Sequence, residues 1–160
     1  MRDAAVLVPT YEQDGREFVV LTVRADVLTH HSNQVAFPGG AKDKIDKSLW
    51  DTALRETQEE LGLDPKAIQL LKELGQQITP TGFRVSPFVG RIMLPEIWNF
   101  NTNEIAEVFS VPLDHLRNKS NLEIEQTCYQ GQQLMDPHFF YRSHVIWGMT
   151  GRVLYEFLEL

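Results

Sequence analysis

Three glutamates with helical spacing are the residues of this chain best suited to carry chemistry. Glu56, Glu59 and Glu60 lie within the segment R-E-T-Q-E-E-L, which runs from Arg55 to Leu61. In a helix, residues at i, i+3 and i+4 share one side, where like charges repel. A divalent cation would offset this repulsion, but acidic runs also occur on solvated helix faces. The neighbouring residues therefore decide between a metal site and an ordinary surface.

A tight glycine segment, Phe37-Pro38-Gly39-Gly40, precedes the acidic segment. Glycine has no Cβ, so Gly39 and Gly40 let the backbone come close to a ligand. Hard oxygen ligands of this kind suit Mg²⁺ or Mn²⁺ rather than zinc. The sequence therefore predicts a Mg²⁺ or Mn²⁺ site. The predicted metal ligands are Glu56, Glu59, Glu60 and the Gly40 carbonyl.

The acidic segment is predicted to be a helix from Ser48 to Leu61. Ser48 is a favourable N-cap, and Asp51 can reach back to it as in a capping box. Gly62 supplies the stop signal, and Pro65 follows it. At about 100° per residue, one stripe of the helix faces a core. Its members are Trp50, Ala53, Leu54, Thr57 and Leu61.

The rest of the chain is predicted to form strands and one further main helix. Apolar, β-branched runs at 4–8 and 18–23 flank the turn signal Asp14-Gly15 and predict a hairpin. Further strands are predicted at 35–37, 68–74, 85–93, 104–111, 122–129 and 132–141. Pro87 indicates an edge or a bulge in its strand. With a helical turn at 112–117 and a final helix at 150–158, the pattern indicates an α/β sandwich with a mixed sheet.

Composition is typical of a soluble globular protein. Of the 160 residues, 42% are apolar and 23% are charged, and the length predicts one domain over residues 1–160. The formal charge of −7 argues against a nucleic-acid partner. Cys128 is the single cysteine, so no intrachain disulfide can form. With no signal peptide or long apolar span, we expect a cytoplasmic protein without a membrane partner.

Gly40 and the stretch R-E-T-Q-E-E-L-G-L, Arg55 to Leu63, resemble the signature of the Nudix hydrolases. That signature reads G-x5-E-x7-R-E-U-x-E-E-x-G-U, with U a bulky apolar residue. The match holds at Gly40, Arg55, Glu56, Glu59, Glu60, Gly62 and Leu63. It departs at Thr57 and in the first half, where Asp46 replaces Glu and eight residues separate it from Arg55. Whether Asp46 takes the part of the first Glu is left open.

A second stretch, just ahead of this box, resembles a motif of the coenzyme A pyrophosphatases. The motif reads roughly L-L-T-x-R-S-x-x-L-R-x-H-x-G-Q-V-A-F-P-G-G-x-x-D. The match holds at Leu21, Thr22, Arg24, Leu28, His31, Gln34, Val35, Ala36, Phe37, Pro38, Gly39, Gly40 and Asp43. It fails at Ala25, Thr29 and Asn33. Loss of the Arg at Thr29 implies weaker or different binding of coenzyme A, if that cation meets a phosphate.

The resemblance implies a Nudix-type α/β/α sandwich with a mixed β-sheet and a metal-dependent pyrophosphatase. The expected reaction cleaves coenzyme A, or a derivative, to 3′,5′-adenosine bisphosphate and 4′-phosphopantetheine. A hydrolase of another nucleoside diphosphate derivative, such as ADP-ribose, NADH or a nucleoside triphosphate, is the alternative. A nucleotide sensor without activity is a third reading, which the intact acidic cluster argues against. Nudix proteins are often dimers, so a homodimer is compatible with the resemblance.

Residue roles follow from the chemistry of a pyrophosphate. The metal cluster would involve Glu59 and Glu60 in catalysis, and the resemblance gives Arg55 the part of steadying the carboxylates. Glu60 itself, or Glu104 or Glu107 from outside the box, could act as general base. Odd spacing places Glu104 and Glu107 on opposite faces of a strand, and we favour Glu104. Either could instead be a solvated charge.

Substrate contacts are predicted from cations and backbone near the box. Arg24 and Lys42 could meet phosphates, although exposed cations are usually solvated, and Gly39 could approach the substrate closely. His31 matches the second motif, whereas His30 and His31 lack the context of a zinc site. Aromatic residues at 83 and 139–141 could stack on adenine but are more often core. Cys128 is predicted to be a buried structural thiol.

Overall fold

The computed structural model describes residues 1–25 and 34–160. The strands are β1 (Arg2–Gln13), β2 (Arg16–Arg24), β3 (Val35–Ala36), β4 (Gly39–Ala41), β5 (Gln69–Glu73), β6 (Gln77–Ile78), β7 (Phe83–Arg91), β8 (Ile105–Pro112), β9 (Leu122–Tyr129), β10 (Gln132–Tyr141) and β11 (His144–Ile146). The α-helices are α1 (Leu49–Leu61), α2 (Leu113–Arg117) and α3 (Gly148–Phe157), with 3-10 turns at Pro65–Ala67 and Lys119–Asn121. None of the described helices is long and apolar enough to cross a lipid bilayer.

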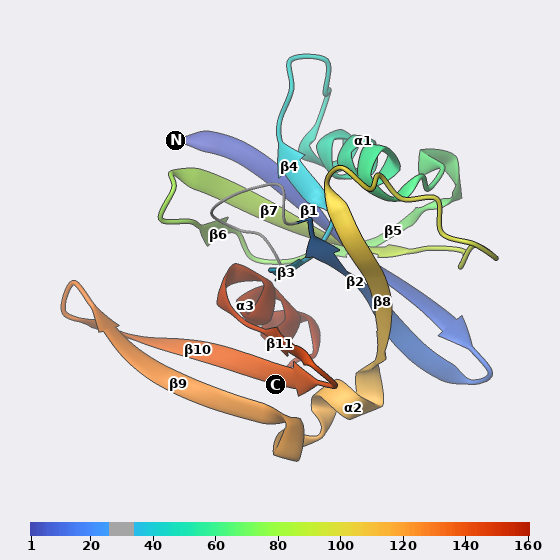
Figure 1. Cartoon of the computed structure of the whole chain (residues 1–160). Coiled ribbons are helices and arrows are strands. Elements are labelled where there is room, and N and C mark those ends of the chain that lie inside the picture. Colours follow the sequence, from blue (N-terminus) through green and yellow to red (C-terminus); the bar gives the residue numbers. More distant parts are fainter. Residues whose placement is uncertain (26–33) are drawn as a thin grey trace.

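An eight-stranded mixed sheet is the central layer, with α1 on one face and α3 on the other (Figure 1). Each face has its own core: Leu7, Val20 and Ala53 belong to the α1 side, and Val8, Leu21 and Leu154 to the α3 side. Side chains of alternate residues point to opposite faces of a strand, which explains this division. The predicted α/β/α sandwich with a mixed sheet is confirmed.

The segment 35–41 fills a fork between β1 and β2. These two strands pair antiparallel near their hairpin, from Thr10↔Val19 to Gln13↔Arg16, as predicted. Farther from the turn, β3 pairs with β2 and β4 pairs with β1. The tight glycine segment is not the loop that its glycines indicate, because Gly39 and Gly40 both lie in β4. Pairing with β1 fixes the backbone of these glycines beside α1.

β7 is an interior strand rather than an edge strand. It runs parallel to β1 along its whole length and pairs antiparallel with β5 and β6 on its other side. The Pro87 carbonyl accepts a hydrogen bond from the amide of Leu74, at 3.0 Å, where β5 gives way to β6. Its nitrogen faces the same break in pairing, so proline is tolerated here. The edge prediction was wrong, and a register shift lies in the partner strand, between Leu70 and Lys72.

The termini of α1 are those predicted from the sequence. The Ser48 hydroxyl accepts a hydrogen bond from the Asp51 amide, at 3.1 Å. Gly62 ends the helix in the left-handed conformation, with φ of 73°, and its amide bonds to the Gln58 carbonyl. A Cβ at position 62 would also lie 2.6 Å from the Asn99 carbonyl oxygen. Glycine is therefore required here for backbone conformation and for space.

A second, smaller sheet of β9, β10 and β11 lies beyond α3 (Figure 1). The β9–β10 hairpin was predicted, whereas β11 was not recognised in its three residues. Cys128 on β9 is exposed, so the prediction of a buried thiol was wrong. β9 is the outer strand of this sheet and pairs with β10 alone, so its side chains have fewer neighbours.

Gly151→Ala is expected to destabilise the protein. Alanine normally favours a helix by about 1 kcal/mol over glycine. A Cβ at this position of α3 would lie 2.6 Å from the Pro137 carbonyl oxygen, which belongs to the backbone of β10. We expect the overlap to outweigh the helix propensity and to cost about 1–3 kcal/mol in the free energy of unfolding. Urea denaturation measures this, with exposed Gln58→Ala on α1 as control; a stabilised Gly151→Ala would contradict the packing.

Candidate metal and phosphate site

Glycines of β4 lie directly against the glutamates of α1. A Cβ on Gly40 would lie 2.6 Å from the carboxyl carbon of Glu56. The Gly39 amide lies near enough to the Glu60 carboxylate to lower its pKa. The two motif halves, which are 15 or more residues apart in the sequence, therefore form one site. The fork between β1 and β2 positions the glycines, and the packed face of α1 positions the glutamates.

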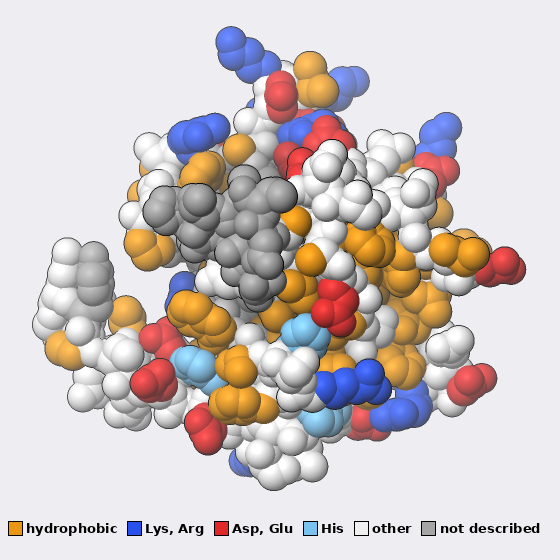
Figure 2. Space-filling view, in the orientation of Figure 1, with side chains coloured by type: hydrophobic (Ala, Val, Ile, Leu, Met, Phe, Trp, Pro, Cys, Tyr) orange, Lys and Arg blue, Asp and Glu red, His pale blue; other side chains and the backbone are white. Residues whose placement is uncertain are grey.

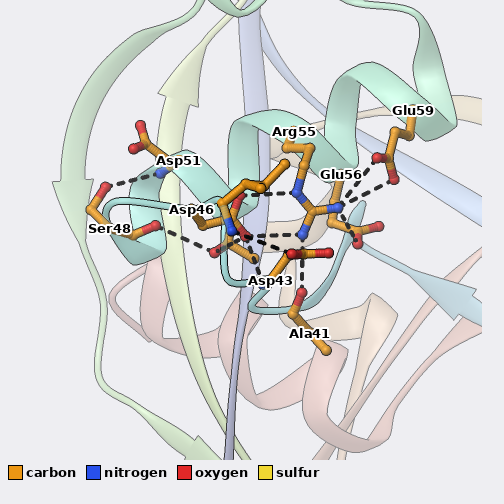
Figure 3. A network of polar contacts seen from close by, with 10 residues as sticks. Ala41, Asp43, Asp46, Ser48, Asp51, Arg55, Glu56 and Glu59 are labelled. Carbon is orange, nitrogen blue, oxygen red and sulfur yellow. Dashed lines mark hydrogen bonds and ion pairs between the residues drawn. The ribbon is translucent and has the colours of Figure 1, made fainter.

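Arg55 is the centre of the polar network that joins these elements (Figure 3). Its guanidinium donates to the Asp46 carboxylate through Nε and Nη2, each at 3.0 Å. Nη1 donates to Glu56 at 3.1 Å and to Glu59 at 3.3 Å. Nη2 also donates to the Ala41 carbonyl at 3.1 Å. Arg55 therefore joins two helix glutamates to the end of β4, as expected if it steadies the carboxylates, and that role stays a prediction.

Asp46, which stands near the position of the first glutamate of the motif, is held by contacts from three residues. Its side chain is buried, and it receives the Thr52 hydroxyl at 2.9 Å and the Asp43 amide at 2.9 Å. The hydrogen bonds from Arg55 are the main reason that the pKa of Asp46 lies well below its usual value. A carboxylate anchored in this way binds Nε and Nη2 of Arg55 and leaves Nη1 for the helix glutamates. These contacts support the part of the first glutamate for Asp46, which stays a prediction, and sequence reasoning missed Ala41 and Thr52 as members of this network.

Glu56 and Glu60 form a partly desolvated acidic pair. Glu60 is 6% exposed, and burial together with the negative charges of Glu56 and Glu104 raises its pKa to about 8. Burial and the charge of Glu59 also raise the pKa of Glu56. Both ionised forms are disfavoured because too little positive charge lies nearby. Oxygen donors of this kind, beside a glycine backbone that leaves them room, fit a hard divalent cation.

Glu59 differs from its two neighbours. Its side chain is 54% exposed and is bonded to Arg55 rather than turned toward Glu60. Among residues 1–25 and 34–160, no three His, Cys, Asp or Glu side chains converge on one point as a ready-made metal cage. Glu56 and Glu60 are thus the members of the predicted ligand set that lie together beside the glycines, and all four predicted ligands stay predictions.

The structure separates the two candidate bases outside the box. The amide of Asn101 donates to the Glu60 carbonyl at 2.9 Å, and the turn that starts there leads to Glu104. The charge of Glu104 raises the pKa values of both Glu56 and Glu60, so its carboxylate lies close to them. Glu107 instead forms an ion pair with His144 at 3.4 Å. Of the two, Glu104 is the one that the fold brings to the acidic pair.

The predicted substrate contacts divide in a similar way. Arg24 and Gly39 line a cavity of about 220 Å³ beside β4, and Arg24 lowers the pKa of Glu60 through its charge. Nε of Arg24 is buried, with no hydrogen-bond partner among the described residues. Lys42 is exposed, and its charge helps to lower the pKa of Asp3. His31, together with His30, lies outside the described residues. Phe139 is fully buried core, whereas Phe83 lines the cavity.

Comparison with known proteins settles the family. Residues 1–129 match the NUDIX domain family. The chain belongs to the Nudix family. A protein of Pectobacterium atrosepticum named uncharacterized Nudix hydrolase NudL is 37% identical over 158 residues, covering 97% of this chain and 80% of that protein. The NudL protein of Photorhabdus laumondii is 35% identical over 160 residues, covering 99% and 84%. As a Nudix hydrolase, this chain belongs to enzymes that generally use divalent metal ions.

Solved structures support the Nudix fold. An Ap4A hydrolase from C. elegans aligns with a TM-score of 0.59 at 18% identity, over 71% of this chain and 82% of that one. The NUDIX domain of Shewanella oneidensis NrtR, solved with ADP ribose, aligns with a TM-score of 0.54 at 20% identity, over 71% and 74%. The TM-scores show a shared architecture, and at such low identities the likeness concerns the fold alone.

Alanine substitutions at the two adjacent glycines are expected to have different effects. A Cβ on Gly39 would lie 2.3 Å from the backbone oxygen of Ala5, so Gly39→Ala should unfold or strongly destabilise the protein. A Cβ on Gly40 would meet only the flexible end of Glu56. Gly40→Ala should therefore stay folded but lose roughly 10- to 100-fold in activity, as a metal ligand is displaced. Thermal unfolding and turnover measure both; a fully active Gly40→Ala variant would contradict the site.

Proposed function

We propose that this Nudix hydrolase cleaves the pyrophosphate bond of coenzyme A or a derivative of it, in the presence of Mg²⁺ or Mn²⁺. The observation that carries the proposal is the desolvated pair Glu56 and Glu60 beside Gly40, with Glu56 bound to Arg55. The choice of coenzyme A rests on the resemblance of the segment 20–43 to the motif of the coenzyme A pyrophosphatases. That segment contributes the fork strands β3 and β4 and the cation of Arg24 to the site.

The substrate has two phosphates in a row, so the site must tolerate concentrated negative charge. Glu56, Glu59, Glu60 and the Gly40 carbonyl would hold the divalent cation, which supplies charge neutralisation and activates water when bound. Arg24, with a buried Nε, would donate to a phosphate oxygen. Arg55 stays in its network with Asp46 and keeps Glu56 in place. This division leaves one arginine for the substrate and one for the protein.

Glu104 is the general base that the fold favours. Its carboxylate would take a proton from the attacking water, whose oxygen bonds to phosphorus while the bridging P–O bond breaks. The products would be 3′,5′-adenosine bisphosphate and 4′-phosphopantetheine. The amide of Asn101 bonds to the Glu60 carbonyl, and the amide of Glu104 bonds to the Asn101 carbonyl. The turn that carries Glu104 is therefore tied to the end of α1.

A substrate panel tests the proposal. Purified protein would be incubated with coenzyme A, ADP-ribose, NADH and nucleoside triphosphates, each with Mg²⁺ or Mn²⁺, and the products identified by mass spectrometry. We expect the highest kcat/KM for coenzyme A, with the two products named above. A higher kcat/KM for another nucleotide would reassign the substrate. No hydrolysis of any of them would favour a nucleotide sensor.

Glu104→Gln is expected to lower kcat about 100-fold, because general-base catalysis contributes at least that much. Glu107→Gln provides a matched control, since Glu107 is 51% exposed and pairs with His144 on the opposite side of β8. This control should keep its activity within about twofold. Equal losses in both variants would remove the assignment of Glu104.

A further inference from the structure

A wide cleft separates the β9–β10 hairpin from the turn between β6 and β7. It has a volume of about 690 Å³, and Figure 2 shows the hairpin standing apart from the body on this side. The residues that line it are Gln77, Ile78, Thr79, Pro80, Thr127, Cys128, Leu134, Met135, Asp136 and Arg152. Cavities of several hundred Å³ are large enough for most of a small organic ligand. No residue of the acidic site lies among those that line the cleft.

The cleft adjoins the cavity beside β4. Thr79 lines both, and α3 contributes Met149 to the smaller cavity and Arg152, one turn later, to the cleft. Residues three apart on a helix share one side, so the two spaces lie along the same edge of α3. The smaller cavity reaches Gly39 and Gly40. A substrate whose pyrophosphate lies at these glycines can therefore extend one arm past Thr79 into the cleft.

The side chains that line the cleft suit a flexible aliphatic ligand better than an aromatic nucleobase. Its apolar part consists of aliphatic and thioether side chains, with Ile78, Leu134 and Met135 being 55%, 42% and 47% exposed. None of the described residues that line the cleft is aromatic, and nucleic-acid bases are commonly held by stacking on aromatic rings. Exposed aliphatic side chains of this kind gain from covering by a ligand, and Met adapts to irregular shapes.

The polar side chains of the cleft form a hydrogen-bonded network. Arg152 donates to Gln77 through Nε at 3.2 Å and to Asp136 through Nη1 at 3.1 Å. The Thr127 hydroxyl donates to the other oxygen of Asp136 at 3.1 Å. These bonds join α3, β6, β9 and β10 across the floor of the cleft. The donors and acceptors are held in place and can pair with the amides of a ligand.

We propose that this cleft binds the pantetheine arm of the substrate, a flexible aliphatic chain with two amides and a terminal thiol or thioester. The inference rests on the proposed function, because it assigns one half of that substrate to a place. The aliphatic wall covers the methylene and methyl groups of the arm, and the Gln77–Arg152–Asp136 network faces its amides. The cleft is open at the hairpin, so an acyl group on the sulfur has room to extend.

Cys128 provides a direct probe of occupancy. It is exposed, lines the cleft and is the only cysteine of the chain, so alkylation by iodoacetamide reports on this place alone. Labelling would be followed by intact-protein mass spectrometry with Mg²⁺ present. We expect S-methyl 4′-phosphopantetheine, which lacks a free thiol and a pyrophosphate, to slow labelling at least about fivefold at saturation. Adenosine 3′,5′-bisphosphate should leave the rate unchanged. Protection by the bisphosphate alone, or by neither compound, would overturn the assignment.

A cleft-filling substitution tests the same assignment by kinetics. Met135→Trp should raise KM for coenzyme A at least about tenfold with little change in kcat. Contacts with the arm stabilise the bound substrate and the transition state equally, so their loss affects KM alone. A truncated substrate with a methyl group in place of the arm should be unaffected. Gln132→Trp, exposed on the same strand but outside the cleft lining, is the control.

The outcomes separate the two proposals. Hydrolysis of coenzyme A with unprotected Cys128 and an unchanged KM in Met135→Trp would overturn the cleft assignment alone. Failure to hydrolyse coenzyme A, with turnover of another nucleotide, would overturn the proposed function. In that case, protection of Cys128 by the phosphopantetheine compound would still support the cleft as its binding place, and absence of protection would overturn both.

Discussion

Glu60→Gln is expected to reduce turnover by about 1,000-fold, since a lost metal ligand removes several kcal/mol of transition-state stabilisation and each 1.36 kcal/mol is tenfold in rate. Gln has nearly the shape of Glu and retains an oxygen that can accept the Gly39 amide. The fold should therefore persist. Measurement of kcat at increasing Mg²⁺ concentration, beside circular dichroism, separates loss of metal binding from unfolding.

Glu59 and Glu73 serve as comparisons for Glu60→Gln. Glu59 is 54% exposed and bound to Arg55, so Glu59→Gln should lose less activity than Glu60→Gln. Glu73 is an exposed acid of β5, and Glu73→Gln should behave as the wild type. If Glu60→Gln retained full turnover, the acidic pair could not be the catalytic metal site, whatever the motif indicates.

Asp46→Asn should have the second-largest effect, and it should act on stability as well as rate. The change leaves the Arg55 guanidinium, 20% exposed, without its bidentate partner. Removing one partner of a buried ion pair costs about 3–5 kcal/mol, and partial exposure of Arg55 reduces this to about 2–3 kcal/mol. Since Arg55 positions Glu56, activity should also fall roughly 10- to 100-fold.

The pH dependence of this destabilisation identifies its cause. The pKa of Asp46 is lower in the folded state, because of Arg55, than its usual value of 3.8. The carboxylate therefore contributes stability above that value, and the contribution is lost as the pH falls below it. Urea unfolding at pH 7 and near pH 3 should show the wild type and Asp46→Asn converging at the lower pH. A gap that does not change with pH would point to packing rather than charge. Thr52→Val, which removes the hydrogen bond from the Thr52 hydroxyl to the Asp46 carboxylate but leaves the ion pair with Arg55, should give a smaller gap.

Helix α1 could be predicted almost to the residue because its signals are local. Ser48 and Gly62 cap it through contacts within one turn, and these need no knowledge of the fold. Even the departure at Thr57 has a local explanation. Its fully buried hydroxyl donates to the Ala53 carbonyl at 2.7 Å, so a polar residue fits where an apolar one is usual. The predicted start and end of α1 were confirmed.

Features that depend on distant contacts could not be predicted. The role of Asp46 depends on how residues 42–48 fold back on α1, and the extra residue before Arg55 obscured the spacing. β4 has three residues, too few for an alternating pattern, and exists because β1 and β2 diverge. Cys128 was predicted to be buried because no Lys or His lies near it in the sequence, whereas its sheet projects from the body and leaves it exposed (Figure 1). In each case tertiary context, and not propensity, decided the outcome.

The parallel ladder between β1 and β7 has a kinetic consequence. Every paired position, from Arg2↔Phe83 to Thr10↔Arg91, joins residues 81 apart (83 − 2 and 91 − 10). Closing so long a loop costs conformational entropy before any pairing is gained, and such non-local contacts slow folding. The hairpin, the fork and α1 all form within the first 62 residues. We therefore expect these early elements to assemble first, while docking of β7 limits the folding rate.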